Sequence, residues 1–285
     1  MCTPVQRTEV QRRTYDAIFS GKEGTLVKTP KLLSRFRKLY YDRFAFRCAV
    51  LLAMALVYFL APEQWLDAAW GLGFFAHFSF LHVLWLLWMV DMILQLCPSR
   101  NYWPLGSQKF LSACFRPILG RISKEGLLRY IKKCNRDTLA IGLIWLGLIL
   151  GLGALYFTGV IDRGALLLIA TVFYLCDLIC VLFWCPFRVW LMKNRCCTTC
   201  RIFNWDHMMM FSPLVFVPGV FTWSLCLMAF AVFLVWEITF AMHPERFWEH
   251  SNGALRCSAC TDRLCGERLC RMDIPDLGQL KMRQE

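Results

Sequence analysis

Long apolar runs alternate with basic, polar segments along this chain. A helix needs about 20 predominantly apolar residues to cross the hydrocarbon core of a bilayer, and four runs come close to that length. Short turns at 62–67 and at Asp162-Arg163 join them in pairs, which predicts two transmembrane hairpins. The four predicted spans are roughly 44–60, 70–93, 139–157 and 165–184.

A fifth apolar stretch, 208–242, is longer than one crossing requires, and Pro213 and Pro218-Gly219 interrupt it. One long span would place the following tail on the far side of the membrane. A short re-entrant segment, or a tight hairpin turning at Pro218-Gly219, would return the tail to the side from which the stretch began. We favour the hairpin or re-entrant form, because it keeps all clustered cysteines on one side.

These patterns predict an all-α fold: a polytopic integral membrane helical bundle with four spans, a C-terminal span or hairpin, and a Cys-rich loop and tail. The predicted segments are a basic N-terminal segment with an amphipathic helix (1–43), transmembrane hairpin 1 (44–97), a basic loop (98–138), transmembrane hairpin 2 (139–184), a Cys-rich loop (185–207), the C-terminal membrane segment or hairpin (208–242) and a Cys-rich tail (243–285).

Composition and charge agree with a membrane location. Apolar residues make up 58% of the 285 residues, and the formal net charge is +12. Lys and Arg concentrate in 1–43, 98–138 and 186–201, and the positive-inside rule then places all three segments in the cytoplasm. We therefore expect a multi-pass protein of the cell membrane with a cytoplasmic N-terminus. Its expected partners are the lipid bilayer and a redox or protein partner on the cytoplasmic side; the basic charge then requires no nucleic acid.

The first candidate for chemistry is the set of 16 cysteines. A Cys-x2-Cys pair lets two thiolates converge on one ion, and two pairs complete a four-sulfur site for zinc or an iron–sulfur cluster. Alternatives are a site in the tail alone, a second site built on Cys185, Cys196, Cys197 and Cys200, or free or redox-active thiols. The candidate metal ligands are Cys197, Cys200, Cys257, Cys260, Cys265 and Cys270.

The second candidate is a set of polar residues inside apolar runs. Charges in the hydrocarbon core are costly and often functional. Asp91, Asp177 and Glu237 would lie about two helical turns from the cytoplasmic surface and could form a proton or cation site. Alternatively, each pairs with an interfacial arginine such as Arg188. His77 shares a helical stripe with Asp91 and is expected to be a neutral residue facing the bundle.

Three short motifs carry a resemblance. They are the run CCTTCRIFNWD at 196–206, HPERF at 243–247 and Cys-Ser-Ala-Cys at 257–260. Together they resemble a group of uncharacterised prokaryotic multi-pass membrane proteins, which have no assigned activity. Cys185-Pro186 ahead of the loop cysteines also resembles polyferredoxin-type membrane electron carriers, in which Cys-Pro at the end of a span precedes iron–sulfur cysteines.

The resulting functional hypothesis is an integral membrane protein with a cytoplasmic-face cysteine metal site, acting as a redox or electron-transfer component. The alternatives are a non-enzymatic membrane scaffold held by structural zinc, and a small-solute or ion transporter that uses the buried carboxylates. The sequence contains no phosphate-binding Gly loop, nucleophile elbow or His-Glu-x-x-His motif. We therefore assign no catalytic residue, and enzymatic activity stays open.

Overall fold

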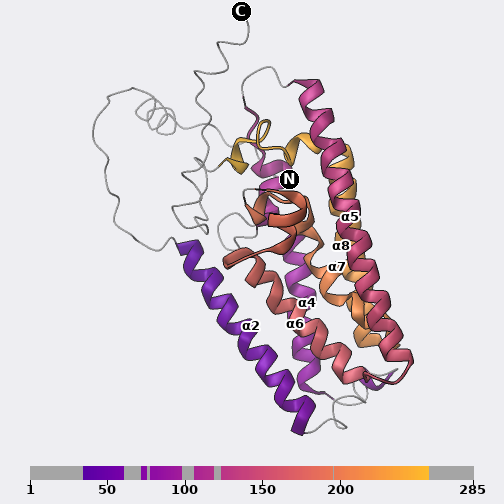
Figure 1. The fold of residues 1–285 in the computed structure, drawn as a ribbon. Helices are drawn as coiled ribbons and strands as arrows, with labels where there is room; N and C mark the ends of the chain where they lie inside the picture. Colours follow the sequence, from indigo (N-terminus) through magenta and orange to yellow (C-terminus); the bar gives the residue numbers. More distant parts are fainter. Residues whose placement is uncertain are drawn as a thin grey trace, which may run out of the picture. The chain divides into compact units, whose positions relative to one another are not determined.

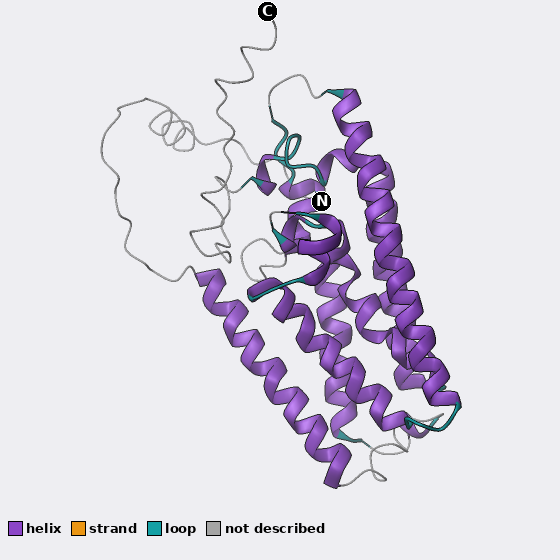
Figure 2. Cartoon of the chain, viewed as in Figure 1, coloured by secondary structure: helices purple, strands orange, loops and turns teal. Residues whose placement is uncertain are grey.

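The computed structural model of the chain describes residues 35–60, 72–75, 78–97, 106–118, 123–194 and 196–256. Within these residues the regular structure is helical, apart from one isolated bridge between Pro117 and Asn252 (Figure 2). The α-helices are α2 (Arg35–Leu60), α4 (Phe80–Leu96), α5 (Lys124–Phe157), α6 (Arg163–Leu182), α7 (Asp206–Phe211) and α8 (Val220–Met242). Single turns are η1 (Gly73–Phe75), η2 (Gly106–Phe110), η3 (Ser112–Cys114), the π-helical η4 (Phe187–Met192), η5 (Cys197–Thr199), η6 (Arg201–Trp205), η7 (Ser212–Phe216), η8 (Pro244–Arg246) and η9 (Gly253–Leu255).

Four of the described helices are long and apolar enough to span a membrane. They are α2, α5, α6 and α8, while α4 is an apolar helix of 17 residues. Large apolar side chains such as Leu143 and Leu150 of α5 lie on the outside of the bundle, where a soluble protein would be polar. The prediction of an all-helical protein with helices long and apolar enough to span a membrane is confirmed.

The helix boundaries differ from those predicted. α2 begins at Arg35 and continues without a break into the predicted first span, so residues 35–43 belong to the same helix. α5 begins at Lys124, where the Ser123 hydroxyl caps it by accepting a hydrogen bond from the Gly126 N–H. Its 34 residues correspond to about 50 Å, which exceeds the hydrocarbon thickness of about 30 Å. The charged first half of α5 therefore extends beyond the membrane core.

The bundle contains antiparallel neighbours, such as α2 and α6, and parallel neighbours, such as α4 and α8 (Figure 1). α2 runs along α6, and two polar contacts fix their opposite directions, Arg47 to Asp177 and Tyr58 to Asp162. Trp88 of α4 is fully buried, and its ring centroid lies 5.2 Å from that of Phe211 in α7. The core therefore joins α4 to the C-terminal third of the chain.

The chain reverses direction between η7 and α8. Three hydrogen bonds join the segment 205–215 to α8 in antiparallel order: Trp205 to Glu237, Cys226 to the Phe211 carbonyl, and Trp223 to the Val215 carbonyl. The reversal falls at Pro218-Gly219, and the Thr222 hydroxyl donates to the carbonyls of Val217 and Gly219 there. Because α7 and η7 lie beside α8, their polar residues enter the helix bundle.

Candidate functional site

The three predicted carboxylates occupy equivalent places in their helices. Asp91, Asp177 and Glu237 each lie five residues before the last residue of α4, α6 and α8 respectively. At 1.5 Å per residue this is about 7.5 Å from the helix end. The structure brings Asp91 and Asp177 together and gives Glu237 a separate set of partners.

Arg47 of α2 joins the first two carboxylates. Its side chain is buried, with an exposed fraction of 7% for the residue, and its guanidinium donates to Asp177 Oδ2 at 2.7 Å and to the Tyr174 carbonyl at 2.6 Å. The Arg47 Nη2 atom lies 3.7 Å from Asp91 Oδ2, and the guanidinium carbon lies 3.9 Å from the centroid of the Tyr174 ring. Sequence analysis missed this residue, although a single arginine inside an apolar run is as costly as a carboxylate.

His207, the second residue of α7, extends the network. Its Nε2 atom lies 3.4 Å from Asp91 Oδ2, and its Nδ1 atom lies 3.1 Å both from Asp206 Oδ1 and from Gln95 Oε1. The Gln95 amide donates to Asp206 at 3.1 Å. Burial acts to lower the pKa of His207, but the charges and hydrogen bonds of Asp206 and Asp91 outweigh it and raise the pKa to about 10. His207 is therefore an imidazolium between two carboxylates at neutral pH.

The network balances its charges. Three cations face three carboxylates, since Arg43 adds its charge near Asp91. The members are Arg43, Arg47 and His207 with Asp91, Asp177 and Asp206. A buried cluster is tolerated when each ion is paired and hydrogen-bonded. This ion network ties α2, α4, α6 and α7 together at one level of the bundle.

Glu237 anchors the Cys-rich loop to α8. Arg201 forms an ion pair with it, and the Trp205 indole N–H donates to Glu237 Oε1 at 2.8 Å. The Arg201 guanidinium also lies over the Phe240 ring, 3.8 Å from its centroid. Asp177 and Glu237 thus pair with Arg47 and Arg201 respectively.

Three thiols meet at the end of α6. Lys193 adopts a left-handed conformation with a φ of 50°, which ends η4 and turns the chain back toward α6. The Cys197 thiol then donates to the Cys180 carbonyl at 3.1 Å, and the Arg188 N–H points at the Cys185 sulfur at 3.4 Å. The thiols of Cys180, Cys185 and Cys197 line the same cavity. We name Cys180, Cys185 and Cys197 the thiol cluster.

Protons are shared unequally within the thiol cluster. The neighbouring Cys180 and Cys197 thiols, followed by backbone N–H groups, hold the pKa of Cys185 far below that of a free thiol. The contact with Cys185 raises the pKa of Cys197, which keeps its proton. Of the three sulfurs, Cys185 therefore has the lowest pKa and is the best nucleophile of the thiol cluster.

Cys200 has different surroundings from Cys197, its partner in the Cys-x2-Cys pair. It is buried, with an exposed fraction of 3%, and burial next to Cys134 raises its pKa to about 12. Among the described residues, no group of three or more His, Cys, Asp or Glu side chains is arranged to hold a metal ion. The other predicted site residues lie outside the described part of the chain: His77, Cys257, Cys260, Cys265 and Cys270.

A cavity of about 340 Å³ connects the thiol cluster with the ion network. The three thiols line it together with Asp177 and Asp206, and the rest of its wall is mostly apolar. Its aromatic wall residues are Trp145, Phe173, Trp184, Phe187 and Phe203. We name this space the thiol cavity, and its size falls in the range of about 300–1,000 Å³ typical of small-molecule sites.

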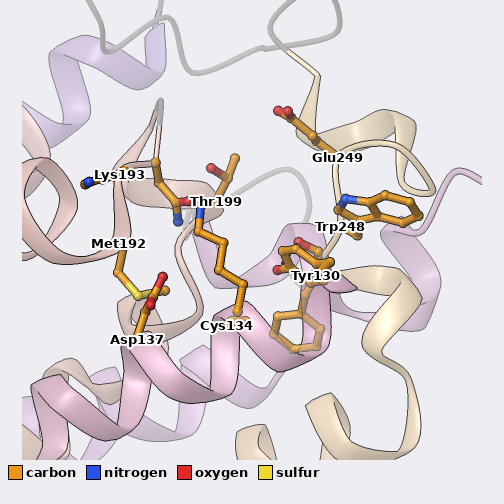
Figure 3. Close-up of a pocket in the computed structure, with 11 residues that line it drawn as sticks. Tyr130, Cys134, Asp137, Met192, Lys193, Thr199, Trp248 and Glu249 are labelled. Carbon is orange, nitrogen blue, oxygen red and sulfur yellow. Dashed lines mark hydrogen bonds between the residues drawn. The ribbon is translucent and has the colours of Figure 1, made fainter. Parts of the chain in front are cut away.

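A second cavity of about 230 Å³ lies between α5, the Cys-rich loop and the segment after α8 (Figure 3). Tyr130 and Cys134 of α5 line it together with Thr199 from the loop, and Trp248 and Glu249 complete the wall. The Tyr130 hydroxyl donates to the Phe247 carbonyl at 2.9 Å. The loop and the segment that leads into the tail therefore meet at this cavity.

Fold and site together define a helical bundle whose long helices are apolar enough to span a membrane, with a buried ion network and three thiols at a mostly apolar cavity. No family model matches the chain, and comparison with curated proteins and with solved structures finds no match. The resemblances to uncharacterised multi-pass proteins and to polyferredoxin-type carriers therefore stay predictions.

Proposed function

We propose that the protein is a membrane thiol redox component in which Cys185 and Cys197 alternate between a thiol pair and a disulfide. The observation that carries the proposal is that Cys180, Cys185 and Cys197 line one cavity at the end of α6, where the Cys197 thiol reaches the Cys180 carbonyl at 3.1 Å. A thiolate next to a protonated thiol is the starting state for disulfide chemistry. On oxidation the two sulfurs form a bond, the Cys197 S–H bond breaks, and one proton and two electrons leave. The redox class predicted from sequence is retained, with thiols in place of a bound metal.

We further propose that the thiol cluster faces the cytoplasm of the cell. The basic segments around α5 and η4 support this orientation, since Lys and Arg accumulate on the cytoplasmic side of membrane proteins. The reversal at Pro218-Gly219 would direct the tail to the same side. In that reducing compartment a disulfide is transient and not a structural bridge, which suits a cycling pair.

A metal centre is the second candidate. It would use Cys197 and Cys200 with Cys257 and Cys260, and would bind zinc or an iron–sulfur cluster. Support comes from the second cavity, where Thr199 of the loop faces Trp248 and Glu249, eight residues before Cys257. A transporter has less support, because Asp91, Asp177 and Glu237 are already paired with cations.

One preparation tests both candidates. The protein is purified in detergent under nitrogen, its metal content is measured, and it is then oxidised with diamide. Mass spectrometry after alkylation of the remaining thiols identifies the disulfides. We expect no stoichiometric metal and a reversible Cys185–Cys197 disulfide that Cys185→Ser abolishes. Cys48→Ser, which removes a half-buried thiol of α2 outside the cluster, serves as the matched control and should behave as wild type.

The outcomes separate the proposals. A Cys185 that is still alkylated as a free thiol after oxidation excludes the thiol redox function. Stoichiometric zinc without colour would assign the cysteines to a structural site. Iron with a visible absorption that bleaches on reduction would assign them to electron transfer through a cluster.

A further inference from the structure

The thiol cavity has two chemically different regions. Apolar and aromatic side chains form most of its wall, including Trp145 of α5 and Phe173 of α6. Trp184 lies at its outer edge, with an exposed fraction of 48%, directly after a helix that is apolar enough to lie in the membrane. The polar region includes the thiol cluster, the carboxylates of Asp177 and Asp206, and Arg188. A ligand that fits must be lipid-soluble, flat enough for aromatic walls, and able to react with thiols.

We propose that the thiol cavity binds the ring of a lipid-soluble quinone, which oxidises the thiol cluster. The proposal rests on the proposed redox function and names its oxidant. A dithiol releases two electrons when the disulfide forms, and a quinone is a two-electron acceptor that dissolves in the same membrane. Aromatic side chains stack against such rings with centroid separations of about 4.5–7 Å. The acyl chain of a phospholipid would fill the apolar region but can neither react with the thiols nor hydrogen-bond to the carboxylates.

The reaction balances with the groups at the cavity wall. The Cys185 thiolate and the Cys197 thiol form an S–S bond and give two electrons to the quinone. The quinone becomes a quinol by gaining two O–H bonds. One proton comes from the Cys197 thiol and the other is taken up from water. Asp206 lines the cavity and contacts the imidazolium of His207, so it is placed to pass this second proton to the quinone oxygen.

The test uses a decyl-substituted benzoquinone whose ring positions are all occupied, which prevents direct addition of thiols to the ring. Reduced protein in detergent is mixed with this quinone under nitrogen, and the conversion of quinone to quinol is followed by ultraviolet absorbance. We expect one quinol for each disulfide formed. Ile179→Trp, which fills the cavity from its α6 wall, should slow quinol formation at least tenfold. Val172→Trp places the same side chain at an exposed position of α6 that does not line the cavity and should match wild type.

Diamide oxidation of the same samples distinguishes the two proposals. If diamide forms the Cys185–Cys197 disulfide in wild type but the quinone is not reduced, the quinone proposal is wrong and the thiol redox function stands. If neither oxidant forms the disulfide, the redox function itself is wrong. Equal quinone reduction by Ile179→Trp and wild type would place the reaction outside the cavity and overturn the proposal. Native mass spectrometry that finds a retained phospholipid, with no quinol formed, would identify an acyl-chain site instead.

Discussion

Replacing Arg47 with Met tests whether the ion network holds the bundle together. The substitution keeps a long side chain but removes the guanidinium that donates to Asp177 and to the Tyr174 carbonyl at 2.7 and 2.6 Å. Three carboxylates would then face two cations. Removing one partner of a buried ion pair costs about 3–5 kcal/mol, because the remaining charge is left uncompensated. We expect Arg47→Met to lower the free energy of unfolding by that amount.

A second substitution separates the charge effect from the loss of packing. In the Arg47→Met/Asp177→Asn protein the uncompensated carboxylate is gone, so about 2 kcal/mol or more of the loss should be recovered. Arg136→Met is the matched control, because Arg136 pairs with Asp137 on the surface and its side chain is 78% exposed. Exposed ion pairs contribute only about 0–1 kcal/mol to the free energy of unfolding, so Arg136→Met should be nearly as stable as wild type.

The assay is an unfolding titration with sodium dodecyl sulfate in mixed micelles, followed by far-ultraviolet circular dichroism. All four proteins are compared at one pH and one detergent concentration. Equal stability of Arg47→Met and Arg136→Met would refute the reasoning. So would a double variant that is no more stable than Arg47→Met, because the cost would then come from packing and not from charge.

Three further predictions concern other parts of the bundle. The proton on His207 stabilises the folded state fully below about pH 6.5, and this contribution is lost as the pH rises through about 10. Unfolding titrations should therefore show a free energy of unfolding that falls over this pH range in wild type and falls less in His207→Gln. Gly153→Val should lower the free energy of unfolding by about 1–3 kcal/mol, because a Cβ atom there would lie 2.6 Å from the Phe216 ring. Gly147→Val is the control, because a Cβ atom at that position meets open space. Equal melting temperatures for the two variants would contradict the prediction. Asn252→Ala removes the amide that donates to the carbonyls of Lys109 and Arg246 and should lower the free energy of unfolding by about 1–3 kcal/mol. Faster hydrogen exchange of the backbone amides in 246–256 would show this loss.

Hydropathy predicts where the membrane helices lie but not where they end. A run of apolar residues marks the part of a helix that sits in hydrocarbon, so the cores of α2, α5 and α6 could be predicted from sequence. The helix itself continues for as long as its backbone hydrogen bonds do. α5 therefore extends N-terminally through charged residues to Ser123, where a side-chain cap ends it, and no hydropathy signal marks that point.

The site was predictable only in part, because its contacts join distant parts of the chain. The carboxylates could be identified individually, since each is a charge inside an apolar run. Their partners could not, because Arg47 and Asp177 are 130 residues apart and local spacing carries no information on such pairs. The cysteine spacing grouped Cys197 with Cys200, whereas the turn at Lys193 directs Cys197 to Cys185 and Cys180.

The ion network also constrains how the chain is made. At a synthesis rate of about 5–20 residues per second, Asp177 follows Arg47 by about 7–26 seconds. During that interval Arg47 lacks the carboxylate to which it donates, although Asp91 of α4 is made earlier, so α2 must stay beside the insertion machinery or near the headgroups until α6 arrives. The short segment of α7 and η7 brings His207 still later and needs α8 to hold it in place. Assembly of the bundle therefore finishes only when the ribosome has completed the last membrane helix.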